Sequence, residues 1–494
     1  MASPSVQKDD GSPLVVKTRT LSQAIASTWD RFLGGRLFLA GDTGSIIIRR
    51  KLMWKRLFLR RCLLALAAAF VLVSASGSLF AQVTAIRAGR LIDPETGTSA
   101  ANQIILVEDG KIRAVGANVD VPAGAETIDL SGLSVLPGLV DAHNHLALTY
   151  KKMPENDIYY FTYVLDSTPL RAIQAVSNGM QMLSSGFTIV RDMGNAGNYA
   201  DTALRVAIEQ GWVPGPTIIN SGLIIGGMGG QFWPTPEMAL DHNIVYPEYL
   251  DADTPDEIIK AVRQNILFGA KVIKIMVDSK PYGYTADEIR LFIDEAAKSG
   301  MIVEGHVETP DGARRAIDAG IWSIAHSEAL DDETHKQMAA KGIWRVGTET
   351  PFTEYRGSQE EFDKTVAGLA NAYENNVPLT FSTDADYYVP GMSRGEVAID
   401  FLLTWKAAGI PAPEILKAMT INGYKCSQTE NERGPIKPGL AADIIAVPGN
   451  PLEDIDALRD VQFVMKDGLV FKQDGVMVPE KFLHGGPVNG WRIR

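Results

Sequence analysis

The stretch PGLVDAHNH, residues 137–145, decides the fold that we predict for this chain. An apolar run ends at Asp141, and His143 and His145 follow two residues apart, in a chain with only 7 histidines. Side chains at positions i and i+2 of a strand point to the same side, so both imidazoles would project together from one strand end. Imidazole is a preferred zinc ligand. By itself, however, the pair is as consistent with a polar loop as with a metal site.

Apolar, strand-like runs recur through the middle of the chain, and helical stretches follow them. Two of these stretches, residues 254–270 and 285–300, open with Thr and acidic residues and end near a glycine, as helices do. Eight strand–helix units predict an α/β fold, a (β/α)8 TIM barrel over residues 137–433. A doubly wound open sheet is the alternative, but no glycine-rich fingerprint follows a first strand.

Both ends of the chain after residue 81 are predicted to be rich in strands. The dipeptide Asp-Gly at 109–110 and again at 467–468 stands between apolar runs, which is a strong hairpin signal. The stretches around them, VEDGKIRAVG and VMKDGLVFKQDG, look like counterparts. We therefore expect a small β-sandwich built from residues 82–136 and 434–494, the second part including the C-terminal tail.

Residues 53–81 have the pattern of a secretory signal peptide. A basic segment precedes an apolar run from Leu63 to Val73, and small residues lead to a predicted cleavage after Ala81. A membrane span needs about 20 apolar residues, so an uncleaved anchor is the weaker alternative. We expect Met53 to be the initiator and residues 1–52 to be a non-structural extension. The pattern predicts export, to a bacterial periplasm or beyond the cell.

Composition and charge limit the partners of this protein. The chain is 46% hydrophobic and 21% charged, with a net charge of −12. Residues 1–82 hold 12 Lys and Arg but 4 Asp and Glu, which leaves the exported part at −20. Such an acidic chain argues against nucleic acid, and against a membrane apart from an uncleaved signal segment. Two cysteines exclude a disulfide framework and a cysteine zinc site. A homo-oligomer remains open.

Residues that can bind metals also stand at the ends of other predicted strands. His306 ends the run MIVEG, His326 ends WSIA, and Asp384 follows PLTFST. Lys274 lies within KVIKIMVD, where strand alternation places it among apolar residues. A buried ammonium is costly, so this lysine is expected to be neutral, paired or modified, unless its head reaches solvent. Carbamylation would turn it into a carboxylate able to bridge two metals. Together these residues predict a metal centre.

With these motifs the chain resembles the metal-dependent amidohydrolase superfamily. The resemblance covers nearly all of the chain after residue 82 and includes the stretches PGLVDAHNH and GPIKPGLAADIIAV. Within the superfamily, GAKVIKIMV favours the branch of imidazolonepropionase-like proteins, ochratoxinase and Xaa-Pro dipeptidases. The residues that match the superfamily's metal ligands are His143, His145, Lys274, His306, His326 and Asp384.

The resemblance implies a role for each of these six residues. The first two histidines would bind one divalent cation together with Asp384. Carbamylated Lys274 would bridge to a second cation, which the two later histidines hold. Nitrogen and carboxylate ligands suit Zn²⁺ best. Two such cations would lower the pKa of a shared water, and Asp384 would act as the catalytic residue that passes its proton to the leaving nitrogen.

We therefore predict an exported, binuclear amidohydrolase that uses metal-bound hydroxide to cleave an amide or peptide bond. Its substrate would be a small molecule such as an N-acyl amino acid, a dipeptide or an ochratoxin-like amide. A one-metal deaminase, or a hydrolase of cyclic amides or lactones, is the alternative within the same fold, but Lys274 favours two metals. A catalytically inactive barrel scaffold is the alternative outside enzymes, and it is disfavoured because no ligand is missing.

Substrate selection is expected in the loops beyond the strand ends. The long segment 225–250 is predicted to be a lid, and Glu308 stands where some relatives carry a tyrosine that contacts substrate. Arg356 would pair with a substrate carboxylate, although an exposed arginine without a specific role is the simpler interpretation. The candidate substrate-binding residues are Gln231, Trp233, Glu308, Tyr355, Arg356 and Tyr387.

Overall fold

The structure is a computed structural model, and it describes most of the chain from residue 83 to residue 478. The described ranges are 83–149, 166–194, 196–230, 248–278, 282–327, 330–351, 358–386 and 388–478. They belong to one compact unit, Ala81–Arg494. Several of the predicted features lie outside the described residues: the extension 1–52, the signal peptide 53–81, Gln231, Trp233, Tyr355, Arg356 and Tyr387.

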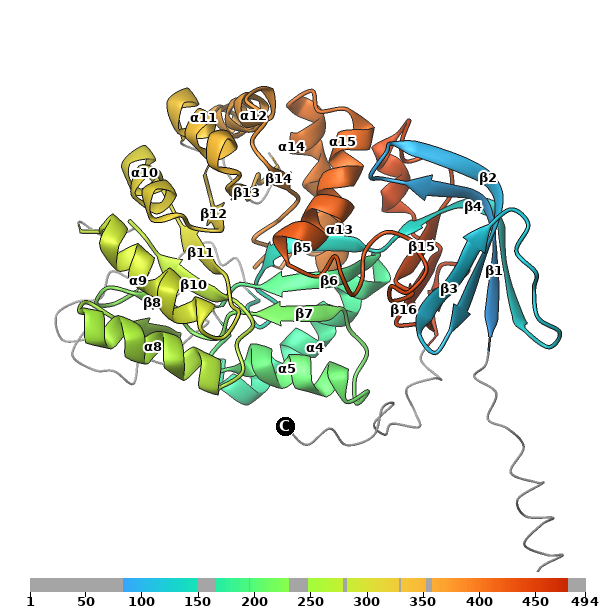
Figure 1. Cartoon of the computed structure of the whole chain (residues 1–494), viewed down its shortest axis with the longest axis horizontal. Helices are drawn as coiled ribbons and strands as arrows, with labels where there is room; N and C mark the ends of the chain where they lie inside the picture. The colour runs from blue at the N-terminus through green and yellow to red at the C-terminus, as the bar shows by residue number, and fades with distance from the viewer. Residues whose placement is uncertain are drawn as a thin grey trace, which may run out of the picture. The chain divides into compact units, whose positions relative to one another are not determined.

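One eight-stranded sheet is built from both ends of the described chain, in the order β18-β17-β16-β15-β4-β1-β2-β3. Strand β4 joins the two parts, since it pairs parallel with β1 and antiparallel with β15. Figure 1 shows this sheet where blue and red strands meet. The strands are β1 Thr84–Asp93, β2 Thr98–Glu108, β3 Lys111–Gly116, β4 Glu126–Pro137, β15 Ile444–Val447, β16 Phe463–Lys466, β17 Leu469–Gln473 and β18 Val476–Met477.

The two Asp-Gly hairpins predicted from the sequence are present in this sheet. Asp109 and Gly110 turn β2 into β3, and Asp467 and Gly468 turn β16 into β17; all four have positive φ, between 50° and 77°. Two-residue turns with positive φ at both positions match the twist of the flanking strands. The two turns also touch, because a Cβ on Gly468 would lie 2.7 Å from the Cα of Gly110.

Parallel strands occupy the middle of the chain and form two sheets. The first has the order β5-β6-β7, and the second has the order β14-β13-β12-β11-β10-β8-β9. The strands of the first are β5 Leu139–Asn144, β6 Phe187–Asp192 and β7 Thr217–Asn220. Those of the second are β8 Ile224–Gly226, β9 Tyr249–Asp251, β10 Ile273–Met276, β11 Val303–His306, β12 Ser323–Ala325, β13 Trp344–Val346 and β14 Leu379–Thr380.

The eight strands predicted for the barrel all occur, and β8 and β9 are additional. Both fall in the segment 225–250 or at its edge, where the sequence predicts a lid. Ile224, Ile225 and Leu250 are buried, and β8 pairs with β10 as well as with β9. The ends of this segment are therefore part of the sheet, and its middle, residues 231–247, lies outside the described residues.

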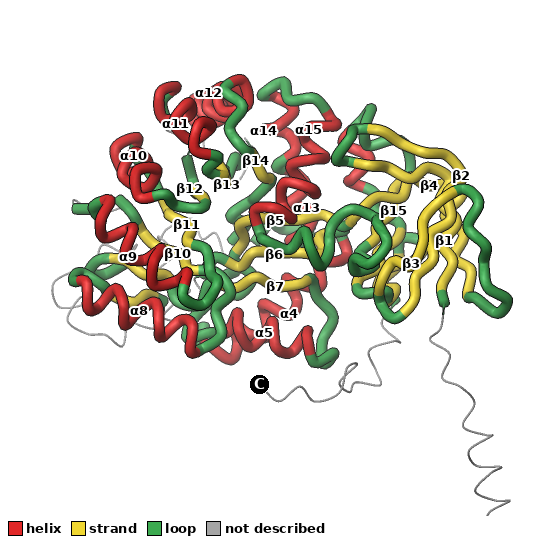
Figure 2. The backbone as a smooth tube through the Cα atoms, viewed as in Figure 1, coloured by secondary structure: helices red, strands yellow, loops and turns green. Residues whose placement is uncertain are grey.

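Helices lie outside the parallel strands (Figure 2). The capping boxes predicted at Thr254 and Thr285 are confirmed, since each side chain accepts from the backbone N–H of a glutamate three residues later. The α-helices are α4 Thr168–Ser184, α5 Ala200–Glu209, α8 Pro255–Leu267, α9 Ala286–Ala297, α10 Pro310–Ala319, α11 Asp332–Lys341, α12 Gln359–Glu374, α13 Arg394–Asp400, α14 Leu402–Ala407, α15 Ala412–Lys417 and α16 Gly423–Cys426. A π-helix, Ala418–Asn422, and a 3-10 helix, Ile455–Arg459, complete the set.

Hydrogen bonds also connect the two parallel sheets to each other. The N–H of Lys271, before β10, donates to the carbonyl of Asn220 in β7 at 2.7 Å. On the other side, the N–H of Ala142 in β5 donates to Phe381 at 3.0 Å. This α/β alternation of parallel strands and covering helices fits a TIM barrel. Among the described residues, the helices are all too short or too polar to cross a membrane.

We predict that Gly110→Ala destabilises the fold by about 2–4 kcal/mol. The added Cβ would lie 2.8 Å from the carbonyl oxygen of Asp467, at a φ of 77° that alanine adopts only with strain. Gly124→Ala is the matched control, because its φ is 86° but no described atom lies within 4 Å of the added Cβ. Urea unfolding monitored by circular dichroism measures both, and an equal loss would contradict the turn contact.

Candidate metal centre

The structure brings all six predicted ligands together at the carboxyl ends of parallel strands. His143 Nε2 lies 3.4 Å from Lys274 Nζ and 3.5 Å from Asp384 Oδ1. His145 Nε2 lies 2.8 Å from the same Asp384 oxygen. The rings of His306 and His326 are tilted by 54° with centroids 4.1 Å apart, and the centroid of the His143 ring lies 5.0 Å from that of His326. The six residues therefore form one continuous cluster.

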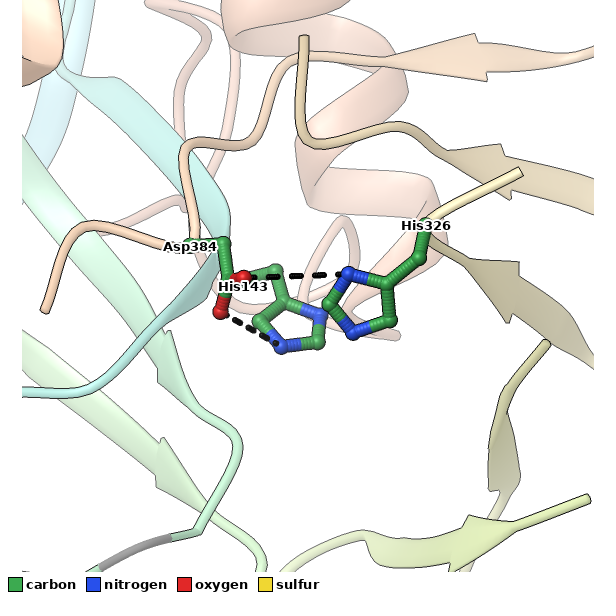
Figure 3. Close-up of side chains that lie close together, drawn as sticks. All are labelled: His143, His326 and Asp384. Carbon is green, nitrogen blue, oxygen red and sulfur yellow. Dashed lines mark ion pairs between the residues drawn. The ribbon is translucent and has the colours of Figure 1, made fainter. Parts of the chain in front are cut away.

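Three of these residues already have the spacing of a metal site. Ligand atoms of His143, His326 and Asp384 all lie within 4.8 Å of one another. Figure 3 shows the three side chains pointing toward one another from separate segments of the chain. Asp384 Oδ2 also lies 3.7 Å from His326 Nδ1. Two imidazoles and one carboxylate are a common ligand set for zinc.

Each histidine of the first strand has its Nδ1 directed away from the cluster centre. His145 Nδ1 donates to the carbonyl of Gly194 at 2.8 Å. His143 Nδ1 lies 2.9 Å from a carboxylate oxygen of Glu304. The carbonyl of Gly194 fixes a proton on Nδ1 of His145, so the lone pair stays on Nε2, the nitrogen that faces Asp384.

The two later histidines have similar outer partners. His306 Nε2 donates to Glu308 Oε1 at 2.8 Å, which leaves its Nδ1 without that proton. His326 Nδ1 lies 3.1 Å from the hydroxyl of Thr348. Carboxylate, carbonyl and hydroxyl partners of this kind orient metal-binding imidazoles in known sites. The sequence prediction did not include Gly194, Glu304 or Thr348.

Burial sets the charge of these groups. It lowers the pKa of His143 to about 4, and it lowers the pKa of His306 and His326 as well, so these imidazoles are neutral near pH 7. Burial also lowers the pKa of Lys274, against the opposing effect of nearby carboxylates. For Asp384, burial would raise the pKa, but His326 and His145 together hold it well below its ordinary value. Three histidines therefore offer neutral nitrogens and Asp384 offers an ionised carboxylate, whereas the hydrogen bond to Asp384 raises the pKa of His145 against the effect of its burial.

The backbone turns sharply at two of the ligands. His326 and Asp384 have φ values of 69° and 52°, in the left-handed region that non-glycine residues seldom adopt. Asp384 is held there by its own N–H, which donates to the carbonyl of His143 at 2.7 Å. Unusual backbone conformations of this kind cluster at functional sites, where the surrounding structure compensates for their strain.

A buried carboxylate fixes the segment that carries Asp384. Asp141 accepts hydrogen bonds from the Thr383 hydroxyl at 2.7 Å, from the Thr383 N–H at 3.2 Å and from the Asn144 amide at 2.9 Å. It also accepts from the N–H of His143 at 3.2 Å. The aspartate at the end of the first apolar run therefore connects the first strand's ligands to the last strand's ligand.

Glu308 is the one predicted substrate-binding residue that lies within the described part of the chain. Its side chain is 52% exposed, and its backbone N–H donates to Asp278 at 2.8 Å. Beside it is a cavity of about 70 Å³ lined by Gly227, Asp253, Met276, Asp278, Tyr282, Gly283, Tyr284 and Glu288. A larger cavity, of about 230 Å³, lies at the starts of β13 and β14, away from the ligands.

Comparison with known proteins agrees with this geometry. Residues 134–471 match the model of the family described as "Amidohydrolase family". The chain belongs to the amidohydrolase family. As a member of it, the protein is a hydrolase that acts on amide carbon–nitrogen bonds. Members of this family are generally metal-dependent, and the cluster above is the candidate site for the metal in this amidohydrolase.

The relatives of this amidohydrolase come from the branch that the sequence predicts. Ochratoxinase from Aspergillus niger is 29% identical over 440 residues, 80% of this chain and 88% of its own. Imidazolonepropionase from Thermoanaerobacter pseudethanolicus is 23% identical over 378 residues, 72% of this chain and 86% of its own. The crystal structure of a Xaa-Pro dipeptidase with bound methionine is 28% identical with a TM-score of 0.68, covering 79% of this chain and 100% of that one.

We predict that Thr383→Val destabilises the amidohydrolase by about 1–3 kcal/mol, because the Asp141 carboxylate then lacks a buried donor. Displacement of the adjoining Asp384 should also lower zinc content at equal zinc supply. Thr404→Val is the matched control, since the buried Thr404 hydroxyl has no hydrogen-bond partner among the described residues. Thermal unfolding and metal analysis test both variants. Equal behaviour of the two would contradict the role given to Asp141.

Proposed function

We propose that this amidohydrolase is a binuclear, zinc-dependent enzyme that cleaves the amide or peptide bond of a small substrate. The observation that carries the proposal is the cluster of six ligand-type residues, in which three histidines have one ring nitrogen held by an outer acceptor. Donor sets that consist of imidazole and carboxylate suit Zn²⁺. Two zinc ions in this site would supply a water activated at neutral pH and polarise the substrate carbonyl.

Lys274 supports the second metal position. Its side chain is 1% exposed and its Nζ lies 3.4 Å from His143 Nε2, between the two groups of histidines. Burial favours the neutral amine, which is the form that attacks carbon dioxide. In that step a nitrogen–carbon bond forms, one carbon–oxygen π pair moves onto oxygen, and one proton leaves the nitrogen for solvent. The carbamate that results would offer anionic oxygen atoms to metal ions bound in this site.

We further propose that the parallel strands close into a (β/α)8 barrel, with a β-sandwich beside it. Closure is supported by the hydrogen bonds across both seams, from Lys271 to Asn220 and from Ala142 to Phe381. The sandwich is supported by an antiparallel bridge between Lys111 in β3 and Ala441, which lies just before β15. This bridge joins the first part of the eight-stranded sheet to the segment that leads into its second part. The sheet therefore folds back on itself, as a sandwich requires.

The proposed substrate is an N-acyl amino acid, a dipeptide or an ochratoxin-like amide. Support comes from the relatives named as ochratoxinase and Xaa-Pro dipeptidase, which cover most of this chain at 29% and 28% identity. Glu308 is proposed to contact the substrate, because its half-exposed carboxylate adjoins His306 at the mouth of the cluster. Export through the signal peptide at residues 53–81 is part of the same proposal and rests on the sequence pattern.

Asp384 is the residue proposed to move the proton. Its carboxylate lies between the Nε2 atoms of His143 and His145 and has a pKa well below the ordinary value, so it is ionised and able to accept a proton from the attacking water. Its side chain is 19% exposed, which gives it access to a bound substrate. From there the proton passes to the nitrogen that leaves when the amide bond breaks.

We predict that Asp384→Asn keeps the fold but lowers kcat by at least about 100-fold, because an amide cannot accept the proton. Circular dichroism and kinetics with a mixed set of dipeptides and N-acyl amino acids would measure this. Asp318→Asn, on the exposed end of α10, serves as the control and should leave kcat unchanged. Turnover at the wild-type rate in Asp384→Asn would disprove the role of this carboxylate.

We also predict that chelation abolishes activity and that zinc with bicarbonate restores it, with about two zinc ions per chain. Bicarbonate is needed because it supplies the carbon dioxide for Lys274. Metal analysis of the purified protein from Gln82 onward, alongside free amino acid release, makes the measurement. One zinc per chain and no effect of bicarbonate would favour the one-metal deaminase instead.

A further inference from the structure

Glu304 is a fully buried carboxylate that is not one of the six ligand-type residues. It lies in β11, where its register partner on β10 is Lys274. Its Oε1 atom is 2.9 Å from His143 Nδ1 and 3.5 Å from Lys274 Nζ. One oxygen atom of Glu304 therefore faces both His143 and Lys274. On the His143 ring it faces Nδ1, whereas Asp384 faces Nε2.

The other oxygen of Glu304 is held by different groups. Oε2 lies 2.9 Å from Arg191 Nη2 and accepts from the Ser323 hydroxyl at 2.9 Å. Arg191 comes from β6 and is itself fully buried; its Nη1 donates to the sulfur of Cys426 at 3.2 Å. Arg191 and Ser323 thus fix the plane of the carboxylate, and Arg191 balances its charge.

A buried ion pair is not by itself a source of stability, because desolvation of the two charges commonly offsets their attraction. An apolar pair of similar volume would fill the same space at comparable or higher stability. The position of Glu304 Oε1 suggests another role. An ionised carboxylate only accepts hydrogen bonds, so the histidine nitrogen that faces it must carry the proton.

We propose that Glu304 is a positioning residue of the metal centre. Its Oε1 atom fixes the Nδ1–H tautomer of His143, so that the lone pair on Nε2 faces the metal position. The same oxygen lies 3.5 Å from Lys274 Nζ, which keeps one hydrogen on nitrogen when it is carbamylated and can direct that hydrogen to Glu304. Arg191 and Ser323 hold the carboxylate in this orientation. The inference rests on the proposed binuclear site, and its test has a readout that does not require metal.

The test compares two double variants that each replace a buried ion pair by apolar residues. Glu304→Leu with Arg191→Met removes the proposed positioning carboxylate without leaving an unpaired buried charge. Asp443→Leu with Arg433→Met is the control, because this largely buried pair lies beside the terminal sheet and Asp467, the second partner of Arg433, keeps its ion pair with Lys466. Thermal unfolding of the metal-free proteins shows whether each variant folds. Glu304→Gln is the second variant if the first does not fold, since it keeps the side-chain volume.

Two measurements on the folded proteins decide the role of Glu304. In metal-free protein labelled with ¹⁵N-histidine, the wild type and the control should show His143 as the Nδ1–H tautomer, and the Glu304 variant should lose this preference. In chelator competition, zinc affinity should fall about 10–100-fold in the Glu304 variant and stay unchanged in the control. The carbamate signal from ¹³C-bicarbonate should weaken in parallel.

An unchanged His143 tautomer together with wild-type zinc affinity in the Glu304 variant would overturn the proposal, because Glu304 would then serve only to neutralise Arg191. Failure of the proposed function gives a different result: the wild type itself would then bind no zinc or form no carbamate. The tautomer measurement still decides the role of Glu304 in that case, because it is made on metal-free protein.

Discussion

The contact between Asp141 and Thr383 is the interaction on which the candidate site depends. It joins residues 242 positions apart in the chain and places the segment carrying Asp384 beside the strand carrying His143 and His145. Without it, the first and last parallel strands would share fewer bonds, and the turn at Asp384 would lack support. The same carboxylate binds the backbone of His143, so one buried aspartate aligns the candidate ligands of both segments.

The cluster as a whole is an arrangement of buried polar groups that lie close to one another. Burial keeps the imidazoles of His143, His306 and His326 neutral, which a metal requires, and outer acceptors decide which nitrogen stays free. Gly194, Glu304 and Glu308 serve three histidines in this way. Such preorganisation lowers the cost of assembling the site when metal arrives, since the rings need not reorient.

Much of the fold was predictable because its signals are local. Strand alternation, capping boxes at Thr254 and Thr285, and Asp-Gly turns each depend on residues a few positions apart. Because these signals are local, all eight barrel strands predicted from the sequence occur in the structure. Strands β8 and β9 were missed, because each has three residues and they are held by pairing with each other and, for β8, with the distant β10. Glu304 was overlooked within MIVEGH, although a charged residue in an apolar run was the available signal.

The sequence by itself determined the types of the ligands and the strand ends at which they stand, and those residues carry the resemblance to amidohydrolases. Only the tertiary structure decided which acceptor faces each histidine, how Arg191 reaches Glu304, and that Asp384 turns toward His143. The physical reason is the separation along the chain of the residues that interact. A strand and its terminal ligand follow from nearest neighbours, whereas these hydrogen bonds join side chains on different strands, whose distances are fixed by register and packing.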